Sequence, residues 1–213
     1  MSNVSLKLRA LSQYAAMLMG ALMLAVALPY AIAMSQLEVG ERGIAPAIMR
    51  HETALSIFPD SATLADLALL RVAAARTGTG TWEQAQASLE AALAQRPQDA
   101  LNWARLAYVY GEQKNYSAIG PALARSISTG SYIPGFMQWR FLLGLTYWPH
   151  LNAAQKQLMA AQALMLWQTK PNDFIRLARM PAIALQIESI MQEYYPIEAP
   201  AFLQRRRPLR HTR

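Results

Sequence analysis

The chain has 213 residues, of which 54% are hydrophobic and 15% are charged, and it contains no cysteine. An apolar content this high excludes a disordered chain, and the lack of cysteine excludes disulfides, thiolate nucleophiles and thiolate metal sites. The formal net charge is +7, but five of the 20 Lys and Arg residues fall within the last nine positions. The rest of the chain is nearly neutral, so we expect a basic tail and no nucleic-acid partner. Abundant Ala, Leu and Gln with sparse Val and Ile favour helix over sheet.

Residues 14–34 form a stretch of 21 residues without a charge, preceded by Lys7 and Arg9. A helix of about 20 apolar residues is long enough to span a bilayer. As an uncleaved anchor, the stretch would leave residues 1–13 in the cytoplasm, because basic residues precede it and acidic ones follow. As a cleaved signal peptide, it would end at residues 31–33, which have the small-x-small pattern of a cleavage site. A third interpretation, a buried core helix, agrees less well with the length and the terminal position.

The anchor and the signal peptide both lead to export of residues 35–213. We expect a single-pass inner-membrane protein with a cytoplasmic N-terminus and a periplasmic helical domain. In this division residues 35–44 are a linker, residues 45–195 form the helical domain, and residues 196–213 are an extended basic tail.

Four prolines recur along the exported part at nearly constant intervals. Pro59, Pro97, Pro134 and Pro171 are separated by 38, 37 and 37 residues, and an Ala-Leu or Leu-Trp pair precedes three of them at the same distance. A proline cannot continue a preceding helix, and an aspartate that follows it can cap the next one. Chance spacing of prolines would not align the flanking residues as well, so the series predicts repeated helix pairs.

Apolar periodicity and capping signals predict nine helices in this region. Asp60 or Ser61 would cap one of them, and Thr81 with Gln84 and Asn152 with Gln155 would form capping boxes. In chain order the predicted helices cover residues 46–57, 61–76, 81–95, 100–113, a partner helix that ends before residue 130, 136–148, 153–169, 174–179 and 182–195. That partner helix contains Gly120-Pro121, which predicts an irregular first turn.

The best-formed copy of the pattern lies between Arg96 and Tyr110. Trp103, Leu106, Ala107 and Tyr110 recur at three- and four-residue steps and share one helical face. With the upstream stripe of Ala85, Leu89 and Ala92, this order resembles a tetratricopeptide repeat read across a repeat boundary. The resemblance implies an all-α fold: a small array of antiparallel helix hairpins, an α-solenoid, after an N-terminal transmembrane helix.

In such an array the hallmark aromatics pack between helices. We therefore expect core positions for the set Trp103, Tyr110, Trp139, Trp148 and Trp167. Recognition would fall to the other side of the first helix, the concave side, where repeat arrays bind peptides or proteins. The candidate partner-binding residues on that side are Leu101, Ala104, Tyr108 and Glu112.

No pattern in the chain indicates catalysis. The three histidines are far apart in sequence and none has a second histidine at metal-ligand spacing. Gly78-Thr79-Gly80 lacks the lysine and the preceding strand of a phosphate-binding loop, and there is no Gly-x-Ser-x-Gly or glycosidase-type carboxylate pair. We therefore expect no enzyme activity, no metal, no cofactor and no small-molecule substrate.

The C-terminal arginines have two interpretations. They are either a solvated tail or a contact to anions, worth about 1 kcal/mol per arginine near an anionic membrane. The anions considered are lipid head groups, an acidic polysaccharide and an acidic patch of a partner protein. The candidate residues are Arg205, Arg206, Arg207, Arg210 and Arg213.

The layout as a whole gives a second resemblance. An apolar N-terminal segment, a degenerate repeat and a clear repeat precede a Gly-Phe-Met-Gln-Trp-Arg-Phe motif at 135–141 and a Leu-Trp-x3-Pro-x-Asp motif at 166–173. This layout is similar to the VpsP-type proteins associated with bacterial exopolysaccharide gene clusters. It implies a non-catalytic scaffold within a cell-envelope complex, accessory to exopolysaccharide biosynthesis or export. The alternative is an assembly or quality-control adaptor that binds peptide clients of the envelope in its concave groove.

Overall fold

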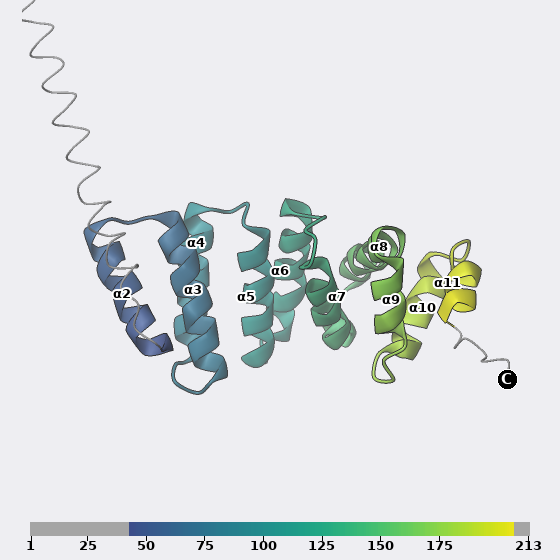
Figure 1. Cartoon of the computed structure of the whole chain (residues 1–213), viewed down its shortest axis with the longest axis horizontal. Helices are drawn as coiled ribbons and strands as arrows, with labels where there is room; N and C mark the ends of the chain where they lie inside the picture. Colours follow the sequence, from purple (N-terminus) through teal and green to yellow (C-terminus); the bar gives the residue numbers. More distant parts are fainter. Residues whose placement is uncertain (1–42, 207–213) are drawn as a thin grey trace, which may run out of the picture. The chain divides into compact units, whose positions relative to one another are not determined.

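The computed structural model describes residues 43–206 (Figure 1). In this range the regular structure consists of ten α-helices and one short 3-10 helix, without a strand, which confirms the all-α prediction. None of these helices is long and apolar enough to cross a membrane. The predicted membrane segment 14–34 lies outside the described residues, as do residues 1–13 and most of the predicted linker.

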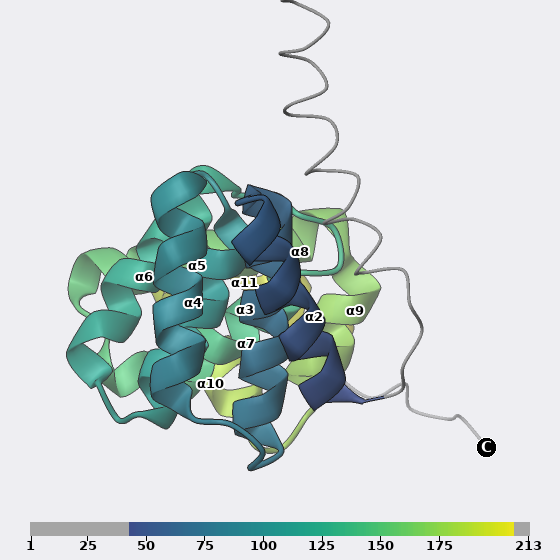
Figure 2. The same ribbon diagram turned by 90° about the vertical axis from the view of Figure 1, so that its left-hand side faces the viewer.

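The chain divides into two compact units, Met1–Ser88 and Leu89–Arg213, and the boundary falls inside helix α4 (Trp82–Gln95). In the first unit, α2 (Ile44–Ile57) and α3 (Ser61–Arg76) lie side by side in both views of the molecule (Figures 1 and 2). Of the two residues predicted to cap α3, Asp60 is the cap: its Oδ2 accepts a hydrogen bond from the Thr63 amide at 2.8 Å.

Arg71 ties the helices of the first unit together. From α3 its Nη1 donates to Ser88 Oγ on α4 at 2.6 Å, and its Nη2 donates to Glu52 Oε1 on α2 at 2.5 Å. The second of these contacts is an ion pair between two partly exposed side chains. Surface ion pairs contribute little on average, so the main effect of Arg71 is to fix the register of three neighbouring helices.

The second unit holds the end of α4 and all the later helices. In chain order these are α5 (Ala100–Glu112), α6 (Tyr116–Thr129), α7 (Met137–Thr146), the 3-10 helix η1 (Trp148–His150), α8 (Ala153–Thr169), α9 (Pro171–Ala178), α10 (Ala184–Tyr194) and α11 (Ala199–Arg206). Helix α5 packs along α6, α7 contacts α8, and α9 contacts α10. The helices therefore follow one another as neighbouring pairs.

The predicted start signals lie where the structure begins its helices. Asp99 Oδ1 accepts from the amides of Leu101 and Asn102, both at 3.0 Å, and so caps α5. Asn152 and Gln155 form the predicted capping box of α8, with both reciprocal bonds at 2.9 Å. The four regularly spaced prolines lie two or three residues before α3, α5 and α7, or form the first residue of α9. Each of them thus opens the first helix of a pair.

Two predicted helix features differ from the structure. Helix α7 ends at Thr146 rather than at residue 148, because Pro149 cannot extend an α-helix and the chain tightens into η1. Helix α6 runs without a break through Pro121, and the irregularity predicted for its first turn is limited to a tight bond from the Ala118 amide to the Asn115 carbonyl, three residues back, at 3.2 Å. A proline this near the helix start removes one backbone hydrogen bond, to the carbonyl of Ser117, and leaves the remaining ones in place.

The C-terminal end corrects a larger prediction. Residues 199–206 were expected in an extended tail, yet they form α11. The anchor is Phe202, which is 0% exposed, with its ring centroid 5.6 Å from that of Phe174 and 5.9 Å from that of Trp167. Pro200 is tolerated because it lies in the first turn, where a backbone N–H has no helical partner in any case. The burial of this one aromatic ring therefore orders a segment whose composition is typical of an extended tail.

Arg140 is a buried cation inside the core of the second unit. It is 0% exposed, and its guanidinium donates to the carbonyls of Ser126, Gly130 and Ser131 at 2.8 to 2.9 Å and to Gln162 Oε1 at 2.5 Å. Burial lowers the pKa of Arg140 to about 10, so the side chain stays charged at neutral pH. A cation here, solvated by carbonyls in place of water, ties the loop after α6 to α7 and α8.

Candidate functional site

The predicted partner-binding residues have different environments in the structure. Ala104 is 0% exposed, so its methyl group is unavailable to a partner and the prediction is wrong for this residue. Leu101 and Tyr108 are half-buried and Glu112 is exposed. The cause is the packing of α5, whose small side chains let neighbouring helices approach closely on more than one side.

Tyr108 is part of a small aromatic surface between α5 and α7. Its ring meets Trp139 edge-on at a centroid distance of 6.3 Å, and Trp139 is 5.3 Å from Phe136. We call these three residues the Tyr108 surface. Trp139 is 38% exposed, so the prediction that it lies in the core is wrong. The buried residues of α7, such as Met137, Phe141 and Leu145, recur at helical steps that leave position 139 outside their stripe.

The other aromatics of the predicted core are packed. Trp103, Tyr110, Trp148 and Trp167 are half-buried against the core of the second unit. Trp103 also donates from Nε1 to the carbonyl of Pro97 at 2.9 Å, which closes the turn before α5. These side chains hold helices together, and Tyr108 packs against the same core, so Trp139 is the exposed member of the Tyr108 surface.

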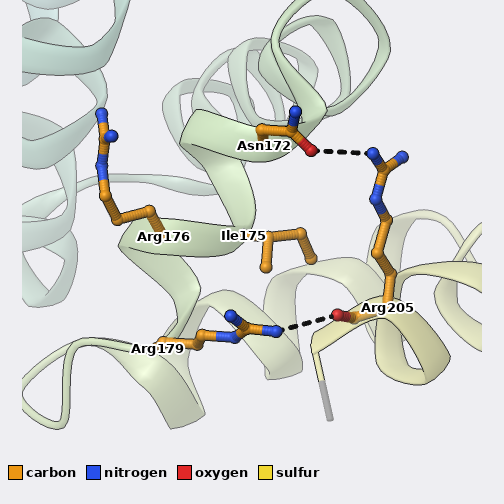
Figure 3. Close-up of a pocket in the computed structure, with 5 residues that line it drawn as sticks. All are labelled: Asn172, Ile175, Arg176, Arg179 and Arg205. Atoms are coloured by element: carbon orange, nitrogen blue, oxygen red, sulfur yellow. Dashed lines mark hydrogen bonds between the residues drawn. The ribbon is translucent and has the colours of Figure 1, made fainter. Parts of the chain in front are cut away.

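A second candidate site is a pocket between α9 and α11, with a volume of about 460 Å³. Its lining residues are Asn172, Ile175, Arg176, Arg179 and Arg205. In Figure 3 the Arg205 and Arg179 side chains lie on two sides of Ile175, and the Arg176 side chain extends away from it on a third. Four of these residues come from α9 and its C-terminal cap, where positions 172, 175, 176 and 179 share one helical face.

Hydrogen bonds fix the walls of this pocket. Arg205 Nη2 donates to Asn172 Oδ1 at 2.8 Å, and its guanidinium lies 5.8 Å from the ring centre of Trp167. Arg179 reaches across to α11, where Nε donates to the carbonyl of Arg206 at 3.2 Å and Nη2 to that of Arg205 at 3.3 Å. Arg176 donates to Asp173 Oδ1 at 2.9 Å. The pocket is thus held by contacts between two helices.

The arginines of the predicted basic tail have different environments in the structure. Arg205 lines the pocket, whereas Arg206 forms an ion pair with Glu188 of α10. Arg207, Arg210 and Arg213 lie outside the described residues. Arg205 is among the candidate site residues predicted from the sequence, whereas Asn172, Arg176 and Arg179 are not. The three- and four-residue spacing of these residues indicates one shared helical face of α9. That this face lines a pocket depends on the packing of α11 against α9, which local periodicity does not predict.

No metal centre is found within residues 43–206, where no three His, Asp or Glu side chains lie close enough together to hold an ion. His51 instead bonds the carbonyl of Ala47 through Nδ1 at 2.8 Å, and His150 stacks on Tyr116 at a centroid distance of 4.0 Å. Comparison of the sequence with protein-family models and with curated proteins gives no match. Any statement of function therefore depends on the fold and the two candidate sites.

Proposed function

We propose that the protein is a non-catalytic adaptor built from helical repeats, anchored in the inner membrane through residues 14–34, with its helical domain in the periplasm. The observation that carries the proposal is the pairing of helices behind regularly spaced prolines, at Pro59, Pro97, Pro134 and Pro171. Repeated helix pairs of this tetratricopeptide-like kind serve mainly to present side chains to other proteins.

The Tyr108 surface supports a protein partner in this role. Aromatic residues are enriched in protein interfaces because they bury a large area at a small cost in conformational entropy. Trp139 offers an exposed ring whose position is fixed by Tyr108 and Phe136. Glu112 lies exposed at the end of the same helix as Tyr108 and would provide a polar rim.

The process that the adaptor serves is proposed from the sequence layout. We propose that it is accessory to exopolysaccharide biosynthesis or export and holds components of that machinery together. Affinity purification of the full chain from membranes should then recover glycosyltransferase, polymerase or export components. Recovery of none of them, together with normal polysaccharide in a deletion strain, would contradict this role.

The surface itself is tested by site-specific photo-crosslinking. A crosslinking residue in place of Glu112 should capture the partner, whereas the same residue in place of the exposed Arg125 of α6 should not. Trp139→Ala should reduce capture at position 112, with Leu185→Ala on α10 as a control because Leu185 is a large apolar residue that is 78% exposed. Equal capture in the Trp139→Ala and Leu185→Ala variants would show that the Tyr108 surface is not the interface.

The same experiment separates the alternative function. An adaptor for assembly or quality control would bind many unrelated envelope proteins, because a groove that accepts peptides makes few specific contacts. Capture of one or two polysaccharide components at position 112 supports the scaffold. Capture of a broad set of exported proteins supports the quality-control adaptor.

A further inference from the structure

The pocket between α9 and α11 has a chemistry of its own that the adaptor function does not use. We propose that it binds an oxyanion, a carboxylate or a phosphate group, carried by a small ligand. Its polar lining consists of Arg176, Arg179, Arg205 and the amide of Asn172, without a carboxylate. A pocket lined in this way attracts negative charge and repels cations.

Arg205 differs from three other described arginines, each of which forms an ion pair. Arg71 pairs with Glu52, Arg176 with Asp173 and Arg206 with Glu188. The side chain of Arg205 instead donates to Asn172, a neutral acceptor, and lies over the ring of Trp167. Neither contact neutralises its charge. The guanidinium at the pocket therefore keeps its full electrostatic attraction for an anion, with N–H groups left to donate.

The positions of the guanidinium groups are set before any ligand binds. Asn172 and Trp167 hold Arg205 from two directions, and Arg179 is held by two backbone carbonyls of α11. Fixing long side chains in advance removes an entropy cost that binding would otherwise carry. Figure 3 shows Arg205 and Arg179 approaching the Ile175 side chain from α11 and from the end of α9.

The lining defines the class of ligand. The planar fork of a guanidinium matches the two oxygens of a carboxylate or a phosphate, which adds geometric specificity to the charge attraction. The volume of about 460 Å³ lies within the range of about 300 to 1,000 Å³ that small-molecule sites occupy. Ile175, which is almost fully buried, gives the pocket an apolar floor. A ligand with one anionic group on a body the size of a sugar ring or a lipid head group fits this description.

Calorimetric titration of the full chain in detergent micelles tests the proposal with three probes. These are inorganic phosphate, glycerol phosphate and glucuronate, which stand for a free anion, a lipid-like head group and an acidic sugar. At least one should bind with one site per chain, more weakly as salt is added, since screening weakens charge attraction. Tightest binding of glucuronate identifies a sugar acid, and tightest binding of either phosphate identifies a phosphate ligand. Dissociation constants above about 10 mM for all three overturn the proposal.

Matched variants assign the binding to the pocket. Arg205→Gln should weaken binding of the preferred probe about tenfold or more, since hydrogen bonds to charged groups are among the strongest. Arg125→Gln removes the same charge from an exposed site on α6 and should change the affinity less than about twofold, as expected for a screened charge. Arg205→Lys keeps the charge without the fork and should fall between them.

A second variant, Arg176→Gln, tests the pocket if Arg205→Gln releases α11 from α9. The side chain of Arg176 is 74% exposed, and among the described residues it forms one ion pair, with Asp173. Arg176→Gln should therefore leave the fold intact. It should weaken binding severalfold. If Arg205→Gln has the thermal unfolding curve of the unmodified protein and binds as tightly as Arg125→Gln, the proposal is overturned. If Arg205→Gln is unfolded, the same comparison of Arg176→Gln with Arg125→Gln decides.

Discussion

Replacing Arg140 with methionine should lower the free energy of unfolding of the second unit by about 3 kcal/mol, because the substitution leaves buried carbonyl groups without donors. The carbonyl of Gly130 and the Oε1 of Gln162 each accept from this guanidinium at 2.8 and 2.5 Å. The carbonyl of Ser131 keeps a bond from Gln162 Nε2 at 3.1 Å, and the carbonyl of Ser126 keeps one from the Gly130 amide at 3.2 Å. Two acceptors are therefore lost outright.

The magnitude follows from these two acceptors. Each unsatisfied buried polar group costs about 1 to 3 kcal/mol, which gives a gross loss of about 2 to 6 kcal/mol. Methionine offsets part of this loss, because it removes the desolvation penalty of a buried cation and fills a similar volume. Arg140 also has a buried Nε without a hydrogen-bond partner among the described residues, so its network is not fully satisfied. The expected net loss in the free energy of unfolding is therefore about 3 kcal/mol, in the lower half of that range.

Denaturant unfolding followed by tryptophan fluorescence measures this change. Four of the five tryptophans, at positions 103, 139, 148 and 167, belong to the second unit, so the signal reports mainly on that unit. Arg125→Gln is the control and should stay within about 0.5 kcal/mol of the unmodified protein. Arg140→Lys should fall between them, because an ammonium group cannot reach carbonyls in several directions. If Arg140→Met unfolds at the same denaturant concentration as Arg125→Gln, the buried network contributes nothing and the reasoning is refuted.

Substitutions at three further positions test the local contacts. Gly111→Ala should destabilise the second unit by about 1 to 3 kcal/mol in the same unfolding assay, since a Cβ there would lie 2.1 Å from the hydroxyl oxygen of Tyr147, and a rigid ring cannot move aside. Asp99→Ala removes the cap of α5 and should cost about 1 kcal/mol, whereas Asp99→Asn should recover most of it. Burial, followed by the charge of Glu90, raises the pKa of Tyr110, so the folded state holds this proton more tightly than the unfolded state does. Stability should fall as the pH rises above about 10, and it should fall less in Tyr110→Phe, which unfolding at a series of pH values would show.

The features that were predictable from sequence are those that short stretches determine by themselves. Asp99 and the Asn152–Gln155 pair cap helices through bonds to amides within three residues. Pro97 and Pro171 mark helix starts because a proline ring excludes the preceding turn. Such signals need no knowledge of distant neighbours, so the order of helices and most of their ends could be read directly.

The exposure of individual side chains depends on distant neighbours and was harder to predict. Ala104 and Tyr108 lie one helical turn apart, yet one is fully buried and the other is half-buried beside Trp139. Arg140 lies in an almost wholly apolar helix, where a charged residue is normally taken as the solvent-facing position. Its burial depends on carbonyls of the loop after α6 and on Gln162 of α8, which local periodicity does not bring together.

The arginine pocket shows how one tertiary contact changes the meaning of a segment. Composition alone places Arg205 in an extended tail, either solvated or in contact with anions, because prolines and like charges disfavour order. Phe202 reverses that expectation: burying a phenyl ring contributes about 2 to 3 kcal/mol, which offsets part of the entropy lost in ordering the eight residues of α11. With α11 docked, Arg205 faces Asn172, and Arg179 bonds the α11 backbone. The pocket therefore exists only when this helix is folded against α9, and an anion held by both helices would in turn stabilise α11 by mass action.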